Sequence, residues 1–135
     1  MKILIIDGQG GGIGKALVEK LRERLPEAEI LAVGANAIAT SAMLRAGANA
    51  AATGENAAIV CCRDADVIAG PIGIVLKDAM MGEITASMAA AVAASPAQRV
   101  LIPVLRCSTY VAGTQGVALQ KLLDDAVSRI AQLAQ

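Results

Sequence analysis

The sequence predicts an α/β fold, a single three-layer, doubly wound domain over residues 1–135 with a mostly parallel sheet. Two observations support this prediction. Short apolar runs without polar alternation, typical of strands covered on both faces, alternate along the chain with segments of helical periodicity. In addition, 135 residues suffice for one hydrophobic core but not for a cofactor domain plus a separate substrate domain. We therefore expect any complete active site to need a second subunit.

The first β-α-β unit is the clearest part of the pattern. The run from Ile3 to Ile6 is wholly apolar, and the amphipathic helix that follows it has one apolar face made of Ile13, Leu17, Leu21 and Leu25. That helix ends at Leu25-Pro26-Glu27, and residues 29–33 form a second apolar strand that stops at Gly34. The unit spans about thirty residues, which is the size of a right-handed crossover.

The remaining elements continue this alternation. We expect a helix capped by Asn36 and ended by Gly47, then a short strand at 49–53 and a helix with Ile59, Val60, Cys61 and Cys62. A strand follows at 66–70, and residues 74–76 extend or cap its edge. The last elements are a helix from Thr85 to Ser95, a strand at 99–104, and a final helix from Leu119 to Ala134. Together these segments predict a Rossmann-like sheet, which binds ligands beyond the carboxyl ends of its strands.

Composition and charge exclude several classes of protein. The 12 basic and 12 acidic residues cancel, and the chain has one Tyr but no Phe or Trp. A nucleic-acid binder would need both a basic surface and stacking platforms, so we expect no nucleic-acid partner. The apolar runs are short, and only Lys2 precedes the first strand as a basic residue. We therefore expect no membrane span, no signal peptide and a cytoplasmic protein.

Cysteines and acidic residues offer little catalytic chemistry. The chain has three cysteines, an odd number, and two of them are adjacent: Cys61, Cys62 and Cys107. Because the chain also has no His, we expect reduced thiols and no metal site. A general base would have to be a carboxylate, an amine or a thiol with a shifted pKa. The candidates near the ligand-binding edge are Glu55, Asp78, Glu83 and Cys107, each of which also suits a solvated or turn position. Catalytic residues therefore stay unassigned.

The glycine-rich loop between the first strand and the first helix is the main functional signal. Residues 8–14 contain five glycines in seven positions, and we assign ligand contacts to Gly8, Gln9, Gly10, Gly11, Gly12, Ile13, Gly14 and Lys15. Such a loop lets backbone N–H groups and the helix N-terminus approach a phosphate closely. The alternative is a turn that is glycine-rich only for packing. Asp7 would repel a pyrophosphate unless it faces away, binds Mg²⁺, or accepts backbone N–H bonds in a turn, the role we favour.

Other strand ends should meet the loop at the same edge of the sheet. They bring Gly34-Ala35-Asn36, residues 53–56, Gly70-Pro71-Ile72-Gly73 and Arg106-Cys107-Ser108 to this edge. Asn36, Gly70 and Pro71 complete the predicted binding site. Asn36 could bond a ligand hydroxyl or merely cap its helix, and we favour the cap.

Gly8-x-x-x-Gly12-Ile13-Gly14 resembles the nucleotide loop of short-chain dehydrogenases, a resemblance that implies NAD(P) or another nucleotide as cofactor. The sequence departs from dinucleotide-binding patterns in two places. Ile13 replaces the third glycine of the G-x-G-x-x-G fingerprint, and the second strand is not followed by an acidic residue for a ribose. Moreover, Tyr110 is followed at the fourth position by Thr114 instead of the catalytic Lys of short-chain dehydrogenases. Their catalytic residues are therefore not carried over.

Gly11-Gly12-Ile13-Gly14-Lys15 also resembles the loop of deviant P-loop ATPases. That resemblance implies a nucleotide hydrolase in which Lys15 reaches the phosphates. Ala16 stands where those proteins have the hydroxyl that binds Mg²⁺. A degenerate P-loop hydrolase is therefore the lesser alternative.

Over nearly its whole length the chain resembles an uncharacterised family of short bacterial proteins marked by Asp-Gly-Gln-Gly-Gly-Gly-Ile-Gly. The resemblance is found at residues 7–14, 36–43, 53–57 and 70–74. It implies a Rossmann-like fold and no particular activity. We therefore expect a small protein that binds a nucleotide, dinucleotide or phosphorylated metabolite, as a sensor or as an enzyme completed by oligomerisation. The rival is a structural or partner-binding module with an empty glycine loop.

The two Ala-rich helices predicted around residues 37–46 and 84–94 have small, weakly charged faces. Such faces allow close packing between subunits. We expect a homodimer or homotetramer that uses one of them.

Overall fold

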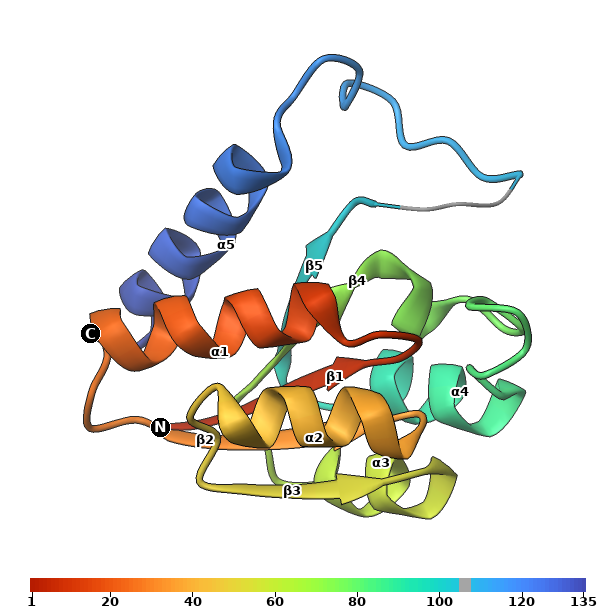
Figure 1. The fold of residues 1–135 in the computed structure, drawn as a ribbon, viewed down its shortest axis with the longest axis horizontal. Coiled ribbons are helices and arrows are strands. Elements are labelled where there is room, and N and C mark those ends of the chain that lie inside the picture. The colour runs from red at the N-terminus through yellow and green to blue at the C-terminus, as the bar shows by residue number, and fades with distance from the viewer. Residues whose placement is uncertain (105–107) are drawn as a thin grey trace.

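The computed structural model describes residues 1–104 and 108–135. Within these residues a parallel sheet of five strands has the order β3-β2-β1-β4-β5 (Figure 1). The strands are β1 (Lys2–Asp7), β2 (Glu29–Gly34), β3 (Ala50–Thr53), β4 (Val67–Pro71) and β5 (Gln98–Ile102). The helices are α1 (Gly12–Arg24), α2 (Ala37–Arg45), α3 (Glu55–Cys61), α4 (Ala86–Ala94) and α5 (Leu119–Leu133), with a short 3-10 helix η1 (Ile72–Val75). The α/β, doubly wound, Rossmann-like fold predicted from the sequence is confirmed.

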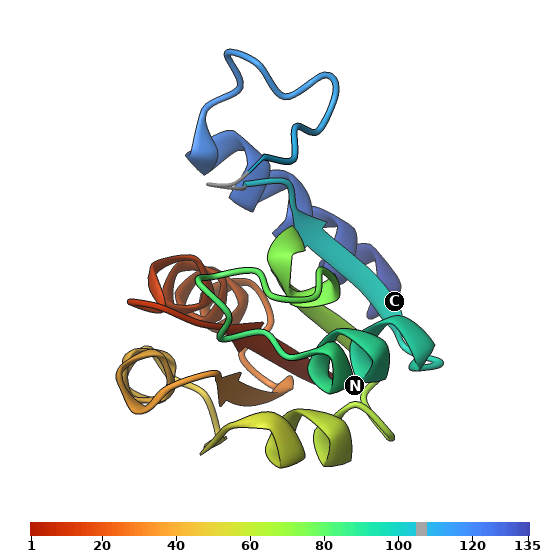
Figure 2. The same ribbon diagram turned by 90° about the vertical axis from the view of Figure 1, so that its right-hand side faces the viewer.

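The sheet is covered by helices on both faces, as Figure 2 shows for α1 and α2 on one side and α3 and α4 on the other. Alternate residues of β1 pack into different clusters because successive side chains of a strand point to opposite faces. Ile3 and Ile5 join the cluster beneath α1, α2 and α5, and Leu4 and Ile6 join the cluster beneath α3 and α4. The unalternated apolar run therefore reflects burial on both faces.

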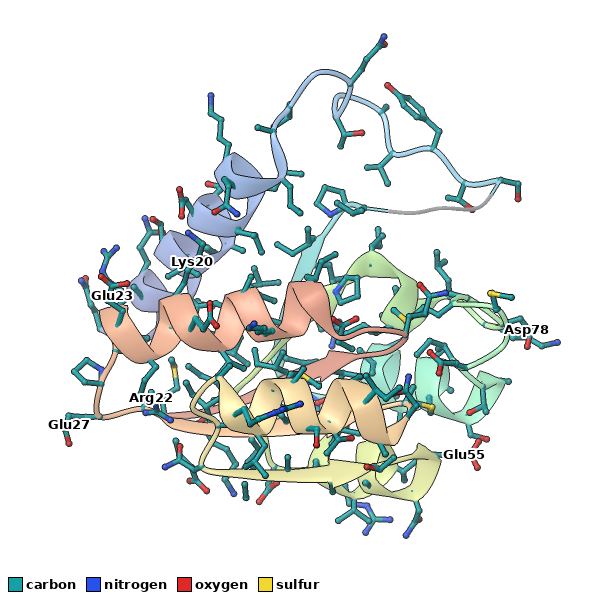
Figure 3. All side chains as sticks on the ribbon, in the orientation of Figure 1. Lys20, Arg22, Glu23, Glu27, Glu55 and Asp78 are labelled. Atoms are coloured by element: carbon teal, nitrogen blue, oxygen red, sulfur yellow. The ribbon has the colours of Figure 1, made fainter. Side chains whose placement is uncertain are left out.

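Helix ends are fixed by side chains that the sequence places at the right positions. Asn36 Oδ1 accepts a hydrogen bond from Ala39 N at 2.9 Å, and Thr85 Oγ1 accepts one from Met88 N at 3.2 Å. Both predicted caps are thus present. Arg22, labelled in Figure 3, donates to the carbonyl oxygens of Gly47 and Ala28 and joins the ends of α1 and α2 to the loops beside them.

Two strand ends differ from the prediction. Residues 72–75 form η1, so residues 74–76 cap the end of β4 and do not extend it. The strand predicted at 99–104 stops at Ile102. The last residue pair of these strands is Pro71 with Ile102, and Pro103 follows. Proline has no N–H for a further ladder bond, so pairing ends where the two prolines stand.

The connection from β5 to α5 leaves the layered body. Its residues 108–118 arch beyond the sheet and the helices in both views (Figures 1 and 2). Tyr110 lies on this arch and is exposed. Across the two described stretches, 1–104 and 108–135, no helix is long and apolar enough to cross a membrane.

Candidate functional site

An open cleft lies beside the glycine loop, at the carboxyl edge of the sheet where the strand order reverses between β1 and β4. This is the position at which doubly wound sheets bind ligands. The cleft has a volume of about 1140 Å³. Its walls are the glycine loop, the end of β4, the loop at 77–82 and the start of α5. The residues that line it include Asp7, Gly8, Gln9, Gly10, Gly11, Gly12, Ile13, Pro71, Met80, Met81, Leu119 and Leu123.

The Asp7 carboxylate fixes the conformation of the glycine loop through two hydrogen bonds. One carboxylate oxygen accepts the Gly8 N–H at 2.7 Å and the other accepts the Gly14 N–H at 2.7 Å. This is the turn role favoured from the sequence, and it caps the first turn of α1. Asp7 is only 5% exposed. Burial raises the pKa of its carboxyl above the ordinary 3.8, the Gly14 and Gly8 N–H groups oppose that rise, and the Glu83 carboxylate adds to it.

Glu83 holds the tip of the loop from the other side. Its Oε1 accepts the Gln9 N–H at 2.6 Å, and its Oε2 accepts a hydrogen bond from Asn36 Nδ2 at 2.7 Å. Asn36 Nδ2 also donates to the Gln9 carbonyl at 2.9 Å. Gln9, which has a left-handed φ of 48°, is therefore fixed by two side chains from distant segments. Asn36 serves both as the predicted cap of α2 and as a support for the loop.

Three of the five loop glycines are closely surrounded by the protein's own atoms. A Cβ on Gly14 would lie 2.5 Å from the Met43 sulfur and 2.9 Å from Asp7 Cβ, and one on Gly8 would lie 2.7 Å from the Met80 sulfur and 2.8 Å from Glu83 Oε1. Gly11 has a φ of 73°, and its Cβ would lie 2.8 Å from Ala39 Cα. Packing therefore explains these three glycines without any ligand.

Gly10 and Gly12 are different. A Cβ on either would have no neighbour within 4 Å, and neither residue has a left-handed φ. Both line the cleft. In the described part of the chain, neither N–H has a protein acceptor, whereas the amides of Gly8, Gln9, Gly11 and Gly14 are all bonded. Among the described residues, the fold thus leaves the N–H groups of Gly10 and Gly12 without a protein partner, in a loop that lines the cleft.

The other predicted binding residues are dispersed. Lys15 lines a separate hollow of about 410 Å³ between α1 and α2, together with Glu19 and Arg45. A Cβ on Gly70 would collide with the Ile6 carbonyl oxygen, so this glycine is needed for the approach of β4 to β1. Pro71 lies on the wall of the main cleft.

Three of the candidate general bases, Glu55, Asp78 and Glu83, belong to the described residues, and no hydrogen bond joins them to one another. Glu55 accepts a hydrogen bond from Thr85 Oγ1 at 2.5 Å at the start of α3, and Asp78 lies at the outer end of its loop, as Figure 3 shows. Cys107 and Arg106 fall outside the described residues. Burial raises the pKa of the Cys62 thiol to about 11, which keeps it protonated and unreactive near neutral pH.

No group of three or more His, Cys, Asp or Glu side chains suited to a metal ion occurs in the described ranges. Sequence reasoning missed Met80, Met81, Leu119 and Leu123 as parts of the cleft. The loop at 77–82 carries no pattern beyond that of a polar turn, and the two leucines fit the periodicity of a helix core. Nothing local in the sequence indicates that these segments line one cleft.

Residues 2–135 match the family described as "Domain of unknown function (DUF3842)". The chain belongs to this family. The resemblance of the sequence to an uncharacterised family is thereby confirmed. No curated protein matches it.

A solved structure with a similar fold is the crystal structure of a dodecameric FMN-dependent UbiX-like decarboxylase from Escherichia coli O157:H7. The two chains are 16% identical with a TM-score of 0.47, and the similarity covers 98% of this chain and 92% of the other. At this identity and TM-score the likeness carries no functional inference.

Proposed function

We propose that this chain binds a nucleotide, dinucleotide or other phosphorylated metabolite at the glycine loop 8–14. The observation that supports this function is the contrast among the glycines. Gly8, Gly11 and Gly14 are explained by packing, whereas Gly10 and Gly12 have no such explanation and open into the cleft. A ligand that needs close access to the backbone accounts for them.

The loop is pre-organised to receive an anion. Asp7 and Glu83 fix its two ends through the amides of Gly14 and Gln9, so little conformational freedom is left to lose on binding. The N–H groups of Gly10 and Gly12 remain as donors, and α1 begins at Gly12 with its partial positive charge. In this proposal, Ile13 and Pro71 form the walls beside the bound group.

NAD(P) or another nucleotide fits the size of the cleft, and the chain would act as a sensor or as an enzyme completed by another subunit. The degenerate P-loop hydrolase has less support, because Lys15 lines the hollow on the α2 side and not the main cleft. The rival from another class is a structural module with an empty loop, which has to explain Gly10 and Gly12 without a ligand.

A thermal-shift panel tests the proposed function. Purified protein is incubated with mononucleotides, NAD, NADP, inorganic phosphate and sulfate, and native mass spectrometry is used in parallel to look for a retained nucleotide. We expect a concentration-dependent rise in melting temperature with at least one nucleotide, independent of Mg²⁺. No response to any nucleotide, phosphate ester or sulfate would reject the proposal in favour of the empty loop.

Self-association is a separate expectation. Ile38 is 71% exposed and Leu44 is 48% exposed on the outer face of α2, one of the two Ala-rich helices. We expect light scattering at micromolar concentration to show a dimer or tetramer, and Ile38→Glu to shift the protein to a monomer. Val60→Glu on α3, where Val60 is 45% exposed, is the matched control and should leave the mass unchanged. A monomeric wild-type protein would contradict the expectation.

A further inference from the structure

Part of the lining of the cleft is apolar. Leu119, which is 42% exposed, and the buried Leu123 contribute from the first turns of α5, and Ile13 and Ala16 contribute from α1. Among the described lining residues Lys77 is the one cation. The cleft therefore combines a small set of backbone donors in the glycine loop with a larger apolar surface, as in sites for small molecules with an apolar body.

The loop at 77–82 carries two methionines to the mouth of the cleft. The Met80 sulfur packs against Gly8, since a Cβ there would lie 2.7 Å from it. Met81 lines the cleft and yet is 96% exposed, which leaves almost its whole thioether side chain without a protein partner. Flexible methionine side chains are suited to contact ligands of irregular shape and aromatic rings.

The backbone of this loop is held in an unusual conformation. Asp78, Met80 and Met81 have φ angles of 67°, 58° and 57°, in the left-handed region that residues with a Cβ seldom occupy. The loop is closed by Asp78 N, which donates to Ile84 O at 2.7 Å, and it is tied to the glycine loop by Glu83. Consecutive left-handed methionines at a cleft match the observation that such conformations cluster at ligand-binding sites.

We infer that Met81 is a ligand-contacting residue, and that the phosphorylated ligand carries an apolar or aromatic body bound in the cleft beside loop 77–82. This inference rests on the proposed function. The phosphate lies at Gly10 and Gly12, and the ring or chain attached to it lies against the apolar lining of the cleft and contacts Met81. A ligand with only a polar sugar attached would leave both apolar surfaces exposed.

The test compares two probes, inorganic phosphate and 1-naphthyl phosphate, titrated into the full chain by isothermal calorimetry. The naphthyl ester should bind at least about tenfold more tightly, because its ring covers the apolar wall. Met81→Asn suits a left-handed backbone while replacing the apolar side chain by a polar one. It should weaken naphthyl phosphate binding by about three- to tenfold and leave phosphate binding unchanged. Met81→Leu is the control and should retain most of the gain.

The outcomes separate the two proposals. If neither probe binds, the proposed function fails and this inference fails with it. If both probes bind equally, or if Met81→Asn binds naphthyl phosphate as wild type does, the inference is overturned while the anion site stands. Gly12→Val should lose both probes, and retained naphthyl binding in that variant would place the ring elsewhere and also overturn the inference.

Discussion

Replacing Gly12 by valine is expected to remove the stabilisation that a bound nucleotide gives to the wild-type protein. With ligand at 100 times its dissociation constant, that stabilisation amounts to about 2.7 kcal/mol. A Cβ at Gly12 would have no protein atom within 4 Å, so the variant should fold normally. The same side chain would fill the space where phosphate approaches the Gly10 and Gly12 amides. Thermal melting with and without nucleotide measures both effects.

Gly14→Val is the matched control for this experiment. Its side chain would collide with Met43 and Asp7, so this variant should be destabilised even without a ligand. The two valines thus separate a binding glycine from a packing glycine within the same turn of α1. A Gly12→Val protein that melts and responds to nucleotide like wild type would show that the ligand does not approach this backbone.

Asp7→Ala is expected to lower the free energy of unfolding by about 2–4 kcal/mol, because it leaves the buried N–H groups of Gly8 and Gly14 without acceptors. The loss of the cap of α1 is part of this cost. Asp7→Asn keeps the volume and one acceptor oxygen, so we expect a smaller loss. Urea unfolding followed by circular dichroism measures both variants. An unchanged midpoint in Asp7→Ala would contradict the structural role given to this carboxylate.

The pH dependence of stability gives Asp7 a second signature. Its folded pKa is raised above the ordinary 3.8, chiefly by burial, so the folded state holds this proton to a higher pH than the unfolded state does. Stability contributed by the protonated form is therefore present below pH 3.8 and is lost as pH rises through the raised folded pKa. Asp7→Asn should lack this component. The difference between the two pH profiles, measured in urea, should fall in that window with this sign.

Much of the fold follows from local patterns. Apolar periodicity predicts the β-α-β unit and the order of the elements. Residues adjacent to the helix starts predict the caps at Asn36 and Thr85. The turn role of Asp7 could also be anticipated, since the N–H groups that donate to it lie within seven residues along the chain. The sequence predicts the end of β5 two residues beyond Ile102, because the apolar run continues past the point where the partner strand ends at Pro71.

A doubly wound sheet with a glycine loop at its carboxyl edge can be predicted from the sequence, because periodicity and glycine content are local properties. Which glycines the fold needs depends on tertiary contacts, since the nearest neighbours of Gly11 and Gly14 are Ala39 and Met43 of α2. The hydrogen bond from Gln9 N to Glu83 joins residues 74 positions apart. The separation of Lys15 from the main cleft depends on how α1 packs on α2. Contacts between distant segments set these features, and no local pattern encodes where such segments meet.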